Sequence, residues 1–187
     1  SSIYLTMCVE DGAKNEKNAN LERKVRVKIK RKFNKVSFYL KKNGNLNMCG
    51  IAGYFGKNSI FKLNIDKTLQ KMRQRGPDFS NHFSKSYPNN LFIYLLNSRL
   101  SIIDLHPRSN QPLIIGDEVI TFNGEIYNYV ELKKHLLLKK INLITNSDTE
   151  ILLQYYKLYG DKCVDHFEGM WSFAIHDSYK NHVLQNS

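Results

Sequence analysis

From residue 48 onward, short apolar stretches alternate with helical patterns, but no regular strand–helix–strand repeat connects them. This order favours antiparallel sheet, because parallel strands need a crossover, usually a helix, between successive members. The expected strands are apolar or strictly alternating and cover residues 49–55, 91–96, 118–122 and 170–176. We therefore expect one domain of mixed helix and sheet, with a substantial antiparallel part.

Local signals predict where several of these elements begin and end. Asn123-Gly124 is a strong turn pair, so the strand at 118–122 is expected to end there. Two capping-box signals, Asn128 with Glu131 and Ser147 with Glu150, each predict a helix start. A third helix is expected before Gly76, because Ile65, Leu69 and Met72 have the spacing of one helical face. The expected helices are amphipathic.

The net charge of +11 is distributed unevenly along the chain. Residues 1–47 carry 12 Lys and Arg against four Asp and Glu, whereas residues 48–187 carry 16 against 13. The basicity therefore belongs mostly to residues 1–47, which we expect to be a disordered or non-native leader, with weak strand-like alternation at 26–31. A nucleic-acid-binding or membrane-surface arm at 23–42 is the less favoured alternative.

Three cysteines, Cys8, Cys49 and Cys163, show neither metal-binding nor disulfide spacing, which fits a reducing, cytoplasmic location. No metal site is expected. No apolar run approaches the roughly 20 residues that a membrane span needs, so no membrane partner is expected.

Cys49 differs from Cys8 in the residues that come after it. Gly50, Ala52 and Gly53 keep the backbone slim, so a substrate can approach it closely. A cysteine at a mature N-terminus also carries its own base, because an α-amine titrates near ~8 and a thiol near ~8.5. Forty-eight residues precede Cys49, so this chemistry requires their removal.

Six motifs in order over residues 48–177 resemble one family, the glutaminase domain of glutamine-dependent asparagine synthetase, a class II (N-terminal nucleophile) glutamine amidotransferase. The motifs are Met48-Cys49-Gly50-Ile51-Ala52-Gly53, Arg73-Gln74-Arg75-Gly76-Pro77-Asp78, Arg99-Leu100-Ser101-Ile102-Ile103-Asp104 with Asn110-Gln111-Pro112-Leu113 after it, Asn123-Gly124-Glu125-Ile126-Tyr127-Asn128, Ser147-Asp148-Thr149-Glu150 and Gly169-Met170-Trp171-Ser172-Phe173-Ala174.

The resemblance implies an α+β fold, an Ntn-hydrolase-like αββα sandwich of two antiparallel sheets flanked by helices. It also implies hydrolysis of glutamine to glutamate and ammonia, for ATP-dependent amidation of aspartate by a synthetase domain that this sequence lacks. ATP and Mg are expected only in that domain, and the glutaminase domain needs no cofactor. Residues 48–187 are expected to be C-terminally incomplete, which would leave the strand at 170–176 without a neighbour on one side.

The resemblance assigns roles residue by residue. Cys49 matches the nucleophile, and Asn123 and Gly124 match the donors to the oxyanion. Arg99 matches the residue that binds the substrate α-carboxylate, and Asp148, assisted by Glu125, matches the partner of the α-ammonium group. The remaining matches are substrate-binding Leu100, Ser101, Ile102 and Ile103, and supporting Arg75 and Gly76. Asn97 and Ser98 depart from the family, which usually carries a His nearby, and this departure bears on pocket packing.

Other functions stay open from the sequence. The same module could serve a surface-polysaccharide pathway, or the chain could be an inactive, truncated remnant. Expected partners are glutamine and an ATP-dependent synthetase domain or chain that receives ammonia, and homodimerisation stays open.

Overall fold

The structure is a computed structural model that describes residues 5–10, 35–39, 49–57, 59–60 and 62–178. The strands of the first sheet are β1 (Leu5–Glu10), β8 (Gly169–Asp177), β7 (Glu118–Ile126) and β6 (Leu113–Ile115), in that order. The strands of the second sheet are β2 (Lys35–Tyr39), β3 (Gly50–Gly56), β5 (Leu91–Arg99) and β4 (Phe79–Tyr87). All paired strands are antiparallel. The helices are α1 (Lys62–Met72), α2 (Tyr129–Leu138) and α3 (Asp148–Tyr159).

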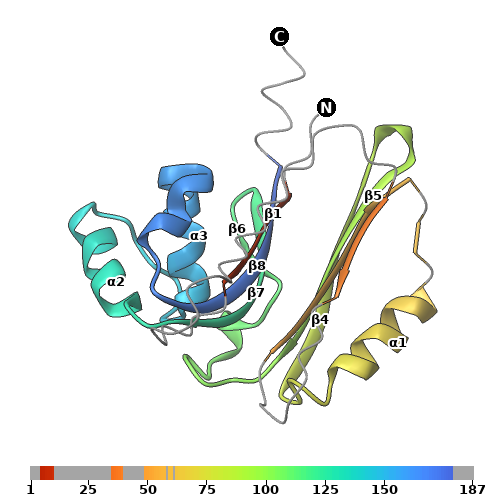
Figure 1. The fold of residues 1–187 in the computed structure, drawn as a ribbon, viewed down its shortest axis with the longest axis horizontal. Coiled ribbons are helices and arrows are strands. Elements are labelled where there is room, and N and C mark those ends of the chain that lie inside the picture. The colour runs from red at the N-terminus through yellow and green to blue at the C-terminus, as the bar shows by residue number, and fades with distance from the viewer. Residues whose placement is uncertain (1–4, 11–34, 40–48, 58, 61, 179–187) are drawn as a thin grey trace, which may run out of the picture.

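The elements form layers (Figure 1). Helices α2 and α3 cover the outer face of the first sheet, the two sheets face each other, and α1 covers the outer face of the second sheet. Three apolar clusters match these contacts, and the largest lies between the first sheet and α2 and α3. A small cluster that includes Phe55, Leu95 and Ala174 joins the sheets, and another that includes Met72 lies under α1. The α+β class and the two antiparallel sheets are confirmed.

The alternation predicted for residues 170–176 is confirmed in β8. Trp171, Phe173 and Ile175 belong to the cluster under α2 and α3, whereas Ala174 points toward the second sheet. Successive side chains of a strand point to opposite faces, so one strand supplies both clusters.

The predicted turn at Asn123-Gly124 is wrong. Strand β7 runs through both residues, which pair with Ser172 and Trp171 of β8. Gly124 has φ +145°, and a Cβ atom there would lie 2.2 Å from the Met170 carbonyl oxygen. The glycine therefore allows two strands to approach closely. Glycine is favoured at such contacts as well as in turns.

The two capping boxes differ in the structure. Ser147 caps α3, since its hydroxyl accepts a hydrogen bond from the Glu150 N–H at 3.3 Å. Asn128 precedes α2 without a side-chain cap. Its amide instead donates to the His166 carbonyl and accepts from the Glu168 N–H, so it joins α2 to the segment before β8.

Strands β1 and β2 come from the segment that precedes Met48. β1 pairs with β8 from Leu5↔His176 to Glu10↔Trp171, and β2 pairs with β3. Strand β8 therefore has neighbours on both sides, and the expectation of an unpaired edge there is wrong. The patterns at 14–24 and 26–31 lie outside the described residues.

Candidate functional site

Cys49 lies just before β3, next to the end of β5. Its Sγ accepts a hydrogen bond from the Leu100 N–H at 3.3 Å and lies 3.6 Å from the Leu100 carbonyl oxygen. Burial raises the pKa of the Cys49 thiol above its ordinary value, and the nearby Asp148 carboxylate adds to this rise. The Leu100 backbone and the Arg99 guanidinium oppose it. A buried thiol of this kind needs a nearby base to become a nucleophile.

Arg99 ends β5 and is only 4% exposed. One terminal nitrogen donates to the Asn110 side-chain oxygen at 2.8 Å. The other donates to the carbonyl oxygens of Ile103 at 3.1 Å and Asp104 at 2.5 Å. The loop that follows β5 thus turns back and holds the guanidinium beside the thiol. An oriented, buried guanidinium is well suited to bind a carboxylate.

Asp148 opens α3 and is 5% exposed. One carboxylate oxygen accepts a hydrogen bond from the Ile126 N–H at 3.3 Å. Burial raises the pKa of Asp148 to about 6, and the neighbouring Glu125 carboxylate contributes to the rise, although backbone hydrogen bonds oppose it. A nearby cation would stabilise the ionised form of this carboxylate and lower its pKa.

Asn123 and Gly124 lie on β7. A buried polar network holds this part of β7 against β5. Asn97 of β5 pairs with Ile51 of β3, close to Cys49 in sequence, and its amide nitrogen lies 3.3 Å from the Phe122 carbonyl oxygen. Asn123 is 8% exposed, and its side-chain oxygen is buried without a hydrogen-bond partner among the described residues. Buried polar atoms are usually paired, so this oxygen can accept a hydrogen bond from a ligand.

Asn97, which departs from the family pattern, packs into the core through its side-chain amide. Its amide nitrogen lies 3.2 Å from Gln111 Oε1 and 3.1 Å from Thr121 Oγ1. Gln111 in turn accepts from the Phe122 N–H at 2.6 Å and donates to Thr149. The network therefore joins β5, β7 and α3 behind the site.

The loop at 73–78 lies on the other side of the β5 end. Gly76 packs directly on it, since a Cβ there would lie 2.2 Å from the Ser98 carbonyl oxygen. The Asp78 carboxylate accepts a hydrogen bond from the Ser101 N–H at 2.7 Å. These contacts place Gly76 where a supporting residue is expected. Ile102, by contrast, is 71% exposed.

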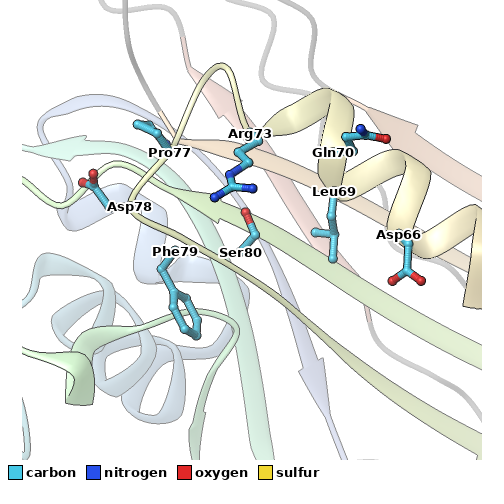
Figure 2. A pocket seen from close by; sticks show the side chains of 8 residues that line it. All are labelled: Asp66, Leu69, Gln70, Arg73, Pro77, Asp78, Phe79 and Ser80. Atoms are coloured by element: carbon cyan, nitrogen blue, oxygen red, sulfur yellow. The ribbon is translucent and has the colours of Figure 1, made fainter.

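A cavity of about 420 Å³ lies between α1 and this loop, as Figure 2 shows. Its lining includes Leu69, Arg73, Asp78 and Ser80, and none of the residues predicted for the site lines it. It adjoins the site through Asp78, and through Phe79 and Ser80, which pair with Arg99 and Ser98 at the end of β5.

The sequence interpretation missed Asp104, which closes the loop after β5. Its carboxylate accepts hydrogen bonds from the backbone of Asn146 at 2.7 Å and of His106 at 3.3 Å, and it pairs with Arg108 at 3.3 Å. Burial raises the pKa of Asp104, but these groups and the nearby Ser109 hydroxyl outweigh it and bring the pKa to about 2. Asp104 is the last residue of the motif that begins at Arg99, and that position was the available signal.

The structure thus joins Cys49, Leu100, Arg99, Asp148 and Glu125 through contacts or electrostatic interactions. Among the described residues, no group of three or more His, Cys, Asp and Glu is placed to hold a metal ion. In the same part of the chain, no helix is long and apolar enough to cross a membrane.

Comparison with known proteins gives one family and a consistent set of relatives. The sequence profile of the family described as "Glutamine amidotransferase domain" matches residues 48–186. A putative glutamine-hydrolyzing asparagine synthetase 2 of Methanocaldococcus jannaschii is 39% identical over 157 residues, which cover 73% of this chain and 29% of that protein. Glutamine-hydrolyzing asparagine synthetase 1 of Bacillus subtilis is 38% identical over 144 residues, covering 73% and 22%. The chain therefore spans less than a third of the length of these curated relatives.

Proposed function

Because the chain belongs to the glutamine amidotransferase domain family, we propose that it hydrolyses the side-chain amide of glutamine, with Cys49 as nucleophile. One observation carries this proposal. Buried Arg99 and buried Asp148 both lie close enough to the Cys49 sulfur to influence its pKa. A guanidinium and a carboxylate near one thiol match the two opposite charges of a free α-amino acid.

The proposed reaction needs the α-amine of Cys49 to be free. The amine takes the proton of the thiol, and the thiolate attacks the amide carbon of glutamine. The carbon–nitrogen bond then breaks, and the amide nitrogen leaves as ammonia with the proton returned by the amine. Water, deprotonated by the same amine, hydrolyses the thioester to glutamate and restores the thiol.

The other residues hold the substrate in this scheme. Arg99 binds the α-carboxylate, Asp148 with Glu125 binds the α-ammonium group, and the side chain of Asn123 with the N–H of Gly124 stabilises the oxyanion. Leu100, Ser101, Ile102 and Ile103 form the adjoining wall, which the contact of Leu100 with Cys49 supports. Arg75 and Gly76 support this wall from behind.

The names of the relatives support a wider proposal. The ammonia serves a synthetase domain or chain that uses ATP to amidate aspartate, as the names of the asparagine synthetases suggest. The domain at 48–187 then has the Ntn-hydrolase-like arrangement, and residues 1–47 form a segment that must be cut away from Cys49.

The test exposes Cys49 without removing any described strand. A site-specific protease sequence that allows cleavage directly before Cys49 replaces residues 43–48, so β1 and β2 stay in the sample. We expect glutamate release from glutamine only after the cut, since a peptide bond at Cys49 removes the basicity of its nitrogen. Glutamate is measured before and after cleavage in the same preparation.

A Cys49→Ala variant carrying the same protease sequence is the matched control and should remain inactive after the cut. Equal activity of the uncut and cut protein would show that the amine is not the base. No glutamate release from the cut protein, with its fold intact by circular dichroism, would overturn the proposed hydrolysis.

A further inference from the structure

The two charges that would hold the substrate come from different parts of the chain. Arg99 ends β5 in the second sheet, and Asp148 opens α3, which packs on the first sheet. The hydrogen bonds of Arg99 go to the loop after β5, and that of Asp148 goes to the Ile126 N–H. Some third group must fix their separation, because a displacement of about 1 Å in a site can cost ~10²-fold in rate.

Asp104 touches both sides directly, in addition to the buried network that runs from Asn97 through Gln111 to Thr149. Its carbonyl oxygen accepts a hydrogen bond from Arg99 at 2.5 Å. Its carboxylate accepts the N–H of Asn146, two residues before Asp148, at 2.7 Å. The bond to Arg99 is partly buried, whereas the bond to Asn146 lies at the surface, because Asn146 is exposed. Charge-assisted hydrogen bonds are roughly twice as strong as neutral ones.

The local backbone shows that this residue is held in an unusual conformation. Asp104 has φ +50°, in the left-handed region that few residues other than Gly, Asn and Asp occupy readily. The conformation aims its carbonyl at Arg99 while the carboxylate reaches Asn146. Arg108 at 3.3 Å and the His106 N–H at 3.3 Å complete the hydrogen bonding of the carboxylate.

We propose that Asp104 is a positioning residue that sets the distance between Arg99 and Asp148, and so the affinity for the α-amino-acid end of the substrate. This inference rests on the proposed function, because it assigns the same two residues to the same substrate. Asp104 itself touches neither the substrate nor the thiol. Its removal should therefore weaken binding and leave the chemical step unchanged.

Two variants separate the carboxylate from the backbone conformation. Asp104→Gly removes the carboxylate and accepts positive φ, and Asp104→Asn keeps the size and the left-handed tendency but loses the charge. Both are made in the cleavable protein, with Asp66→Asn, on exposed α1, as the matched control. We expect KM for glutamine to rise about tenfold or more in both Asp104 variants, from the loss of a charge-assisted hydrogen bond, and kcat to stay within about twofold.

Binding is measured without turnover in the Cys49→Ala background by calorimetry. Glutamine and glutamate share the α-amino-acid end, so both should lose affinity by the same factor in Asp104→Asn. Combination with Arg99→Lys should give less than the product of the two separate losses, because both substitutions alter the same pairing of Arg99 and Asp148 with the substrate. Losses that multiply independently, or a fall in kcat with an unchanged KM, would overturn the positioning role.

A readout independent of catalysis keeps this inference distinct from the proposed function. The loop held by Asp104 begins at Leu100, whose N–H contacts the Cys49 sulfur. Alkylation of Cys49 by iodoacetamide, followed by peptide mass spectrometry, should be faster in Asp104→Gly than in wild type and unchanged in Asp66→Asn. If wild type does not bind glutamine but alkylation is still faster in Asp104→Gly, the proposed function fails. The role of Asp104 in holding the loop after β5 then stands. An unchanged alkylation rate overturns this role itself.

Discussion

The buried carboxylate of Asp148 opposes folding, although the proposed function assigns it to substrate binding. Burial raises its pKa from an ordinary value of 3.8 to about 6. The unfolded chain thus ionises this acid more readily than the folded one, so the ionised carboxylate opposes folding. The penalty is absent below about pH 4, grows as the pH rises toward 6 and persists above it. A shift of this size corresponds to about 3 kcal/mol.

We therefore expect Asp148→Asn to be more stable than wild type at pH 8, by up to about 3 kcal/mol, because it removes the buried charge. The same variant should lose glutamine binding by ~30-fold or more, since truncating one partner of a buried charge pair costs ~2–5 kcal/mol. Urea unfolding at pH 8 and calorimetry in the Cys49→Ala background measure the two effects.

The variants are compared at one pH, because His176 changes the pH dependence of stability in the direction opposite to Asp148. Burial and the nearby Lys85 lower the pKa of His176 to about 4, so its contribution to stability is lost as the pH falls from about 6.5 to about 4. At pH 8 neither group titrates. A variant that gains stability and keeps its glutamine affinity would show that Asp148 does not bind the substrate ammonium.

At the scale of single residues, the sequence identified candidate site residues but not the contacts between them. Cys49, Arg99 and Asp148 were found through the resemblance, and the structure brings them together. The contacts of Asp104 and Asn97 could not be predicted, because each bridges segments far apart in the chain. No local pattern encodes a pairing of that kind.

Individual elements show which local signals prevail. The Ser147 cap was predicted, because it depends on neighbouring residues alone. Asn123-Gly124 was misinterpreted, since a turn pair and a close strand contact favour the same residues. Strand β4, with the sequence Phe-Ser-Asn-His-Phe-Ser-Lys-Ser-Tyr, was missed because it lies at a sheet edge and carries many polar residues.

Gly124 offers a test at the level of the strand pair. We expect Gly124→Ala to destabilise the protein by more than about 2 kcal/mol, because its Cβ would meet the Met170 carbonyl oxygen and its φ is positive. Gly160→Ala is the matched control, with φ +58° and nothing within 4 Å of the added Cβ. It carries backbone strain of about 1–3 kcal/mol but no steric contact, so it should lose less than Gly124→Ala. Chemical denaturation compares the two, and equal losses would contradict the close contact of β7 and β8.

In the whole molecule, both sheets draw an outer strand from residues 1–47. A proline at Cys8 removes an N–H from β1 opposite Phe173 of β8. We expect Cys8→Pro to expose the β8 edge and cause self-association, because unpaired strand edges template pairing between chains. Cys8→Ser keeps the backbone and is the control. Light scattering at several concentrations measures the effect, and a monomeric Cys8→Pro would show that β1 does not protect this edge.

Strands β1 and β2 lie on different sheets but on the same side of Cys49 in sequence. A cut before Cys49 would therefore yield a two-chain complex, in which one released peptide lies along an edge of each sheet. Before the cut, the covalent connection to Cys49 keeps each strand at an effective concentration on the order of millimolar. After it, occupancy follows mass action, and dilution favours release. Maturation would thus make the covering of both sheet edges depend on how much protein is present.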